Sequence, residues 1–115
     1  MGAMAWVYMV ECSDGSFYIG STRNLDNRLV QHNEGTGARY TARRRPVKLV
    51  WCADYERVDD AFTMEKQIQG WSRAKRIALI EGRFDDLPEL AKRRSGGDGV
   101  WWLTRAQRDL AEDAD

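Results

Sequence analysis

The sequence predicts an α+β fold: a small, mainly antiparallel three-stranded sheet flanked by helices, in the order β-β-α-β-α-α. Three observations support this class. Two short runs rich in aromatic and β-branched residues flank the turn signal Asp14-Gly15. A third apolar run follows a helix-like segment, and two more helix-like segments come after it. The 115 residues are enough for one modest domain built in this way.

The first two strands are expected at 6–11 (WVYMVE) and 16–21 (SFYIGS). The glycine of the turn accepts the positive φ that a tight connection between them needs. Tyr8 and Tyr18 lie at matching offsets on either side of the turn, so both are expected on one face of the hairpin. Gly20, at the end of the second strand, would permit a bulge or a close backbone approach.

The segment after the hairpin has the features of a helix of roughly nine or ten residues. Asn24 is a suitable N-cap, and Gly35 is expected to end the helix. Arg28 and His32 are four residues apart, so they share one helix face. A basic loop that ends at Pro46 is expected to follow.

The rest of the domain is expected to contain one strand and two helices. The strand is expected at 47–56 and a helix at about 59–70. Glu65 belongs to a different surface of this helix from the apolar stripe expected to face the core, which is Ala61, Phe62, Met64 and Ile68. A further short helix is expected to end at Gly82.

From residue 83 onward the composition changes. We expect a folded domain over 5–82 and a C-terminal extension over 83–115, which holds a short helix, the glycine-rich linker SGGDG and a Trp-containing helix. Adjacent Trp101 and Trp102 are costly to expose together. This segment is therefore expected to dock onto the domain or onto a partner protein.

Composition excludes several classes of protein. No apolar run approaches the ~20 residues that a bilayer span requires, and the N-terminus lacks the pattern of a secretory signal. Cys12 and Cys52 have no Cys or His neighbour at metal-ligand spacing, so buried free thiols are expected. Together these features predict a cytoplasmic protein with no membrane association.

The net charge is zero, with 18 basic and 18 acidic residues, but the charges are unevenly distributed. Residues 23–48 hold seven basic residues against two acids, and residues 66–83 hold five against one. The acids gather at 54–65 and from Asp85 onward. A neutral total therefore conceals a local positive field of the kind that attracts a polyanion such as nucleic acid.

Five polar side chains would form a site for phosphodiester hydrolysis if the fold brings them together: Tyr8, Tyr18, Arg28, His32 and Glu65. The carboxylate would hold a hard divalent cation together with several waters. The guanidinium would neutralise charge on the phosphoryl oxygens. A phenol or the imidazole would take a proton from the attacking water. Each residue alone also has an ordinary structural interpretation, as a packed ring, a helix cap or a solvated helix charge.

Two tripeptides in the adjoining strands, Trp6-Val7-Tyr8 and Tyr18-Ile19-Gly20, resemble the paired motifs of the GIY-YIG nuclease family. The first motif has Trp-Val in place of Gly-Ile, and the second is intact. The similarity continues through STRNLDNRLVQHNEGTGARYT, RRPVKLVW and EKQIQGWSRAKRIALIEG, and it covers roughly residues 5–82 in the expected order. The chain most resembles the small single-domain bacterial members, which are similar to the N-terminal nuclease domain of the bacterial excinuclease.

The resemblance implies a role for each residue of the set. Tyr8 and Tyr18 would position and activate the water nucleophile. Arg28 would stabilise the scissile phosphate, and His32 would serve in proton transfer. Glu65 would be the single protein ligand of the divalent metal, Mg²⁺ or Mn²⁺.

Two further positions follow from the resemblance. Gly20 would pack closely beneath the site. The family also carries a polar residue late in the domain, often Asn, which has no match in this sequence. Gln69 and Ser72 stand in that region.

Three functions are compatible with these features. The leading hypothesis is a metal-dependent endonuclease that hydrolyses DNA, acting on branched, nicked or damaged structures in DNA repair or recombination. Its basic loop would contact backbone phosphates with little base specificity, through Arg39, Arg43, Arg44, Arg45 and Lys48. The alternative is a catalytically weak nucleic-acid-binding module that acts with a partner protein. A third hypothesis is a structural or interaction protein that uses Trp101-Trp102 as its docking surface.

Overall fold

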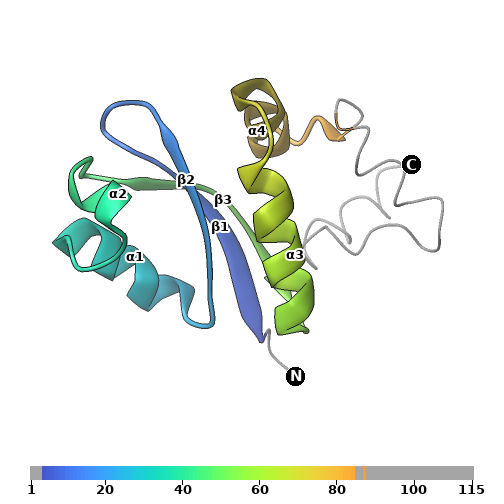
Figure 1. The fold of residues 1–115 in the computed structure, drawn as a ribbon, viewed down its shortest axis with the longest axis horizontal. Coiled ribbons are helices and arrows are strands. Elements are labelled where there is room, and N and C mark those ends of the chain that lie inside the picture. The colour runs from blue at the N-terminus through green and yellow to red at the C-terminus, as the bar shows by residue number, and fades with distance from the viewer. Residues whose placement is uncertain (1–3, 85–86, 88–115) are drawn as a thin grey trace.

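The computed structural model describes residues 4–84 and Leu87, and it confirms the predicted class (Figure 1). The elements in chain order are β1 (Ala5–Glu11), β2 (Phe17–Thr22), α1 (Leu25–Glu34), α2 (Arg39–Ala42), β3 (Lys48–Tyr55), α3 (Val58–Gln69) and α4 (Arg73–Ile80). The one difference in element order is α2, a helix of four residues inside the segment expected as a basic loop. So short a helix shows no apolar periodicity in the sequence.

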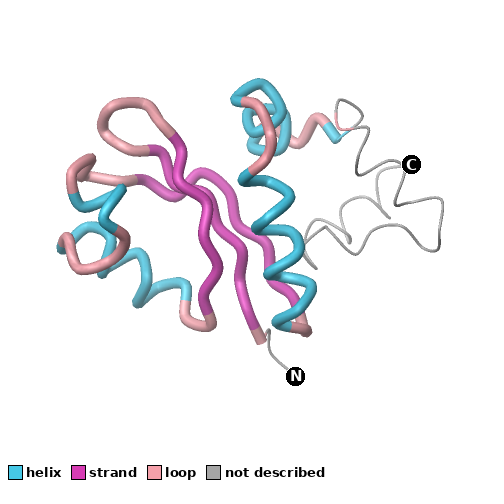
Figure 2. Tube along the Cα trace, viewed as in Figure 1, coloured by secondary structure: helices cyan, strands magenta, loops and turns pink. Residues whose placement is uncertain are grey.

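The three strands form one antiparallel sheet in the order β2-β1-β3, with β1 in the centre (Figure 2). Tyr8 of β1 is the cross-strand partner of Gly20 in β2, and Val10 is the partner of Tyr18. Cross-strand partners project to the same face of a sheet. Tyr8 and Tyr18 therefore share one face, as their offsets about the turn predict.

Helices cover both faces of this sheet, with α1 and α2 on one side and α3 and α4 on the other (Figure 1). The larger core lies under α3 and α4 and includes Val7, Met9, Trp51 and Leu79. Each large side chain buried in this way contributes about 1.5–3 kcal/mol to folding.

A second, smaller cluster lies on the face covered by α1. Its buried members are Tyr8, Val10, Cys12 and Val47. Leu25 and Leu29 of α1 pack against it, together with half-buried Cys52. This smaller cluster positions Tyr8, so the groups considered below sit on a packed base.

Local signals account for the ends of α1. The side chain of Asn24 accepts a hydrogen bond from the Asn27 backbone N–H at 3.0 Å, which satisfies a free amide of the first turn. Gly35 ends the helix in the left-handed region, at φ 85°. Both ends agree with the prediction. None of the helices in the described residues is long and apolar enough to cross a membrane.

The apolar stripe predicted for α3 is wrong at Phe62. Ala61, Met64 and Ile68 are buried, whereas Phe62 is 54% exposed and its ring lies 5.0 Å from the Lys66 ammonium. The buried positions are spaced by three and four residues, so they lie on one side of the helix, and Phe62 is rotated by about 100° from its neighbour Ala61.

Leu87 is fully buried and belongs to the larger core. The expectations for the rest of the C-terminal extension, including the glycine-rich linker and the docking of Trp101-Trp102, lie outside the described residues.

Candidate active site

A buried pair of Tyr8 from β1 and His32 from α1 lies at the centre of the site, with Tyr8 Oη 2.6 Å from His32 Nε2. The other ring nitrogen, Nδ1, lies 2.7 Å from Thr41 Oγ1. The Thr41 hydroxyl has one proton, and it donates that proton to the Ala38 carbonyl at 3.0 Å. It therefore accepts from His32 Nδ1–H. This assigns the tautomer: Nε2 carries the lone pair and accepts the Tyr8 O–H.

The electrostatics agree with a neutral His32 and a protonated Tyr8. Burial lowers the pKa of His32 from its ordinary value, and the positive charge of Arg28 lowers it further. Burial is also the largest influence on Tyr8 and raises the pKa of its phenol. A hydrogen bond from Arg28 opposes this rise, and the charges of Tyr18 and Glu65 add to it. The Tyr8 proton therefore stays in place, directed at an acceptor nitrogen.

Two glycines leave room for this pair and no room for a side chain. A Cβ at Gly20 would lie 2.6 Å from Tyr8 Oη, and a Cβ at Gly37 would lie 2.7 Å from His32 Nδ1. The β1–β2 pairing runs through Gly20 without a register shift. Of the two expectations for Gly20, close approach is therefore correct and a bulge is not. The close approach is to the Tyr8 side chain.

Arg28 connects the two phenols. It lies on α1 one turn before His32, and its Nη1 donates to Gln31 Oε1 at 3.2 Å. Its hydrogen bond to the Tyr8 oxygen is the largest influence that raises the pKa of Arg28, with a smaller one from Tyr18. The Tyr18 ring lies 5.4 Å from the His32 ring and 6.5 Å from the Tyr8 ring. Two phenols, an imidazole and a fixed positive charge thus share one small volume.

Glu65 comes from α3, on the other side of the sheet, and is anchored to the edge strand β2. Its Oε1 accepts from Ser21 Oγ at 2.6 Å, and its Oε2 accepts from Gln69 Nε2 at 3.0 Å. Gln69 Nε2 also lies 3.4 Å from the Ile19 carbonyl oxygen. The Glu65 charge is the smallest of the influences that raise the pKa of Tyr8.

The donor set suits a hard divalent cation held mainly by water. Among the described residues no group of three or more His, Cys, Asp or Glu side chains could hold a metal ion. Glu65 accepts one hydrogen bond on each oxygen, and a carboxylate has about four lone-pair sites. Two sites therefore remain for a cation. A single carboxylate with several waters is a usual way to bind Mg²⁺.

The structure brings Tyr8, Tyr18, Arg28 and His32 together and anchors Glu65 at the edge strand β2, which also holds Tyr18. It also adds contacts to these residues that the sequence did not indicate. Thr41 fixes the His32 tautomer, and Ser21 and Gln69 fix the Glu65 carboxylate. Gln69 lies in the region where the family carries its late polar residue, and it contacts Glu65. No pattern in the sequence pointed to Ser21 or Thr41, because their partners come from distant segments.

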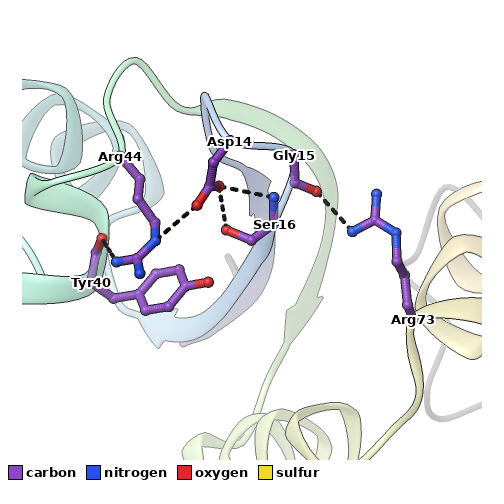
Figure 3. A network of polar contacts seen from close by, with 6 residues as sticks. All are labelled: Asp14, Gly15, Ser16, Tyr40, Arg44 and Arg73. Atoms are coloured by element: carbon purple, nitrogen blue, oxygen red, sulfur yellow. Dashed lines mark hydrogen bonds and ion pairs between the residues drawn. The ribbon is translucent and has the colours of Figure 1, made fainter.

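The basic residues of the expected loop are not equivalent. Arg39, Arg43, Arg45 and Lys48 are exposed, although Arg45 Nε donates to the Ala42 carbonyl at 2.9 Å. Arg44 is instead paired with Asp14, with 3.0 Å between Nε and Oδ2 (Figure 3). A shallow hollow of about 570 Å³ lies here, lined by Arg39, Tyr40, Ala42, Arg43 and Arg44.

The fold and the clustered residues can now be compared with known protein families. The GIY-YIG catalytic domain matches residues 4–78, and the chain belongs to this family. The resemblance seen in the two tripeptides is confirmed. Membership implies nuclease activity.

Particular relatives cover the same region. The UPF0213 protein SAV0488 of Staphylococcus aureus strain Mu50 is 44% identical over 78 residues, which span 68% of this chain and 95% of the relative. The solution structure of protein EF2693 from E. faecalis is 34% identical, covers 71% of this chain and 90% of its own, and superposes with a TM-score of 0.51. The names of these relatives state no reaction. The reaction proposed below is therefore inferred from the residues of the site.

Proposed function

We propose that this protein is a divalent-metal-dependent endonuclease that hydrolyses DNA phosphodiester bonds. The observation that supports this most strongly is the hydrogen-bonded chain from Tyr8 through His32 to Thr41, set beside Arg28 and Glu65. This is the arrangement of an activated oxygen, a base and a group that orients the base.

The proton path begins at the Tyr8 oxygen. In the free protein this fully buried oxygen donates to His32 Nε2, and the Arg28 guanidinium lies near enough to lower its pKa against the effect of burial. A phosphodiester draws the Arg28 guanidinium toward its own oxygens, which frees a lone pair of Tyr8 for the attacking water. Tyr8 takes a proton from that water while its own proton passes to His32 Nε2. The hydroxide attacks phosphorus, the bond to the leaving oxygen breaks, and the imidazolium returns its proton to solvent or to the leaving group.

Arg28 and Glu65 handle the negative charge that builds up during this step. Arg28 neutralises charge on the phosphoryl oxygens, and its position beside both phenols puts it where the attacking water is activated. Glu65 would hold Mg²⁺ or Mn²⁺, which would supply further charge neutralisation at the phosphate. Ser21 and Gln69 keep the carboxylate in a single orientation for this purpose.

DNA is the substrate that the charge distribution favours. Exposed Arg39, Arg43, Arg45 and Lys48 lie in one basic segment next to the site and contact backbone phosphates. Phosphate contacts carry no base sequence. We propose that the protein recognises DNA structure, such as branched, nicked or damaged DNA, and acts in DNA repair or recombination in the cytoplasm.

The test is cleavage of supercoiled plasmid and of branched DNA, with Mg²⁺, with Mn²⁺ and with EDTA. Wild-type protein should nick DNA when a divalent cation is present. Glu65→Ala and Arg28→Ala should each lower the rate by about 100-fold or more, because each removes charge stabilisation in the transition state. The matched controls Glu34→Ala and Arg57→Ala change exposed residues of the same types and should cleave at the wild-type rate.

Two outcomes would change the assignment. Wild-type rates in both Glu65→Ala and Arg28→Ala would show that the catalytic roles are wrong. Binding of DNA without metal-dependent nicking, across all the substrate shapes, would favour the nucleic-acid-binding module that acts with a partner.

A further inference from the structure

The turn between β1 and β2 is tied to α2 through the carboxylate of Asp14 (Figure 3). Asp14 Oδ1 accepts from the Ser16 backbone N–H at 3.0 Å and from Ser16 Oγ at 2.6 Å. Asp14 Oδ2 accepts from Arg44 Nε at 3.0 Å. The two Ser16 hydrogen bonds are the largest influences that lower the pKa of Asp14, and the Arg44 charge lowers it further. The carboxylate is therefore a stable anionic partner for Arg44.

Arg44 uses its guanidinium within the protein. Besides the Asp14 contact, Nη1 donates to the Tyr40 carbonyl at 3.0 Å, and Cζ lies 3.8 Å from the centre of the Tyr40 ring. Its backbone carbonyl accepts from the Ser13 N–H at 2.9 Å. The Arg44 side chain is 33% exposed, whereas Arg39 and Arg43 are more exposed to solvent. Two of the five N–H donors of Arg44 and one face of its guanidinium are thus used within the protein, and these contacts hold it in one orientation.

The contacts of Tyr40 lead from Arg44 to the active site. The Tyr40 ring stacks on the ring of Tyr18, with centroids 6.0 Å apart and an interplanar angle of 26°. Tyr18 in turn lies edge-on to His32 at 5.4 Å. A continuous row of contacts thus joins the turn carboxylate to a phenol of the site, in the order Asp14, Arg44, Tyr40, Tyr18.

We infer that Arg44 and Asp14 are a positioning pair that fixes the Tyr18 ring through Tyr40, and that Arg44 does not bind substrate phosphate. This inference rests on the proposed role of Tyr18 in hydrolysis. It divides the basic segment by function: Arg39 and Arg43 face the DNA backbone, and Arg44 supports the reacting groups. The sequence RRR at 43–45 gives no sign of this division.

The two roles of Arg44 predict opposite effects of Asp14→Asn. If Arg44 held a phosphate, removing the competing carboxylate would release the guanidinium and tighten DNA binding. If Arg44 positions Tyr18, removing the Asp14 charge makes Arg44, Tyr40 and Tyr18 more mobile and slows the reaction. Misplacement of a reacting group by about 1 Å can cost up to about 100-fold in rate.

The experiment compares Arg44→Lys, Asp14→Asn, the double variant and Arg43→Ala in plasmid nicking. Arg44→Lys keeps the charge and loses the planar fork. We expect Arg44→Lys and Asp14→Asn each to lower kcat about tenfold with KM within about twofold, and the double variant to be no slower than either single variant. Arg43→Ala should raise KM and keep kcat. Arg57→Lys and Asp59→Asn alter a matched exposed pair, 3.6 Å apart, and should match wild type.

A second experiment, NMR spectroscopy of the tyrosine rings, does not depend on nuclease activity. In protein with ¹³C-labelled tyrosine, Arg44→Lys and Asp14→Asn should shift the ring signals of Tyr18 and Tyr40, and Arg43→Ala should leave them in place. Wild-type kcat in Arg44→Lys, or a lower KM with unchanged kcat in Asp14→Asn, would overturn the positioning role. If wild-type protein cleaves no DNA, the proposed function fails, and the tyrosine signals still decide whether the pair positions Tyr18.

Discussion

Adding a single Cβ atom at position 20 tests the close packing of the backbone against Tyr8. A Cβ there would lie 2.6 Å from the oxygen of Tyr8, which is fully buried and held by His32. We expect Gly20→Ala to displace Tyr8, to lower the free energy of unfolding by about 1–3 kcal/mol and to abolish most of the cleavage. Denaturant unfolding and plasmid nicking measure the two effects.

Gly70→Ala is the control for this substitution. A Cβ at Gly70 would have its nearest neighbour at 3.6 Å, an ordinary contact, and φ there is −85°. Its stability and nicking rate should stay close to wild type. Equal behaviour of the two variants would contradict the close packing assigned to Gly20.

The buried imidazole predicts a dependence of stability on pH. Burial, followed by the Arg28 charge, lowers the pKa of His32 in the folded protein below its ordinary value of about 6.5. Between the two values the unfolded chain binds a proton that the folded chain does not, so stability rises with pH in this window. The contribution is complete above about pH 6.5 and declines as the pH falls toward the folded pKa.

His32 is the one histidine in the sequence, which makes the measurement simple. Urea unfolding between about pH 5 and 7.5 should show the decline in wild type and its loss in His32→Gln. The acidic limb of the nicking rate should lie below about pH 6.5 for the same reason, because neutral His32 accepts the proton. A wild-type stability that increases on acidification through this range would contradict the prediction.

At the scale of elements, α1 carries two site residues and depends on its cap. Asn24 accepts from the Asn27 N–H at 3.0 Å. Asn24→Ala should cost about 1 kcal/mol of folding free energy, with a smaller effect from Asn24→Asp, which keeps the acceptor. Thermal unfolding measures both. Equal stability of Asn24→Ala and wild type would show that tertiary packing alone holds this helix.

The elements show what the sequence could and could not predict. The boundaries of α1 are local properties of Asn24 and Gly35, so they could be predicted. Tyr8 and Tyr18 share a face because parity about the turn between their strands determines it. The prediction that Phe62 faces the core is wrong because adjacent residues on a helix point in directions about 100° apart, and Ala61 already occupies the buried side.

Contacts between layers could not be predicted in the same way. Ser21 meets Glu65 across 44 residues, and Thr41 meets His32 from the short helix α2. These partners are fixed by how the helices pack on the sheet, which no local pattern encodes. The five residues of the proposed site could be named from the sequence, whereas Ser21 and Thr41, which hold two of them in orientation, could not.

At the scale of the whole molecule, a chain of zero net charge carries a basic segment at 39–48. Arg39→Ala and Arg43→Ala should weaken DNA binding for all sequences alike. Each should make the slope of log K against log salt less steep by about 0.9. Fluorescence anisotropy at several salt concentrations measures this slope. Arg57→Ala, a change of the same charge in the turn before α3, should leave it unchanged.

The glycine contacts around Tyr8 and His32 bear on how substrate binding is divided from catalysis. Glycine at positions 20 and 37 lets the backbone lie directly against the Tyr8 oxygen and the His32 ring, and both side chains are fully buried, so the pair is ordered when the chain folds. The conformational entropy of ordering it is therefore lost during folding, and none of it is lost during the encounter with DNA. Because the Tyr8–His32 pair is already ordered, little of the free energy of DNA binding is used to rearrange it. The domain can then be small, because a long binding surface is not needed to bring these two groups into alignment.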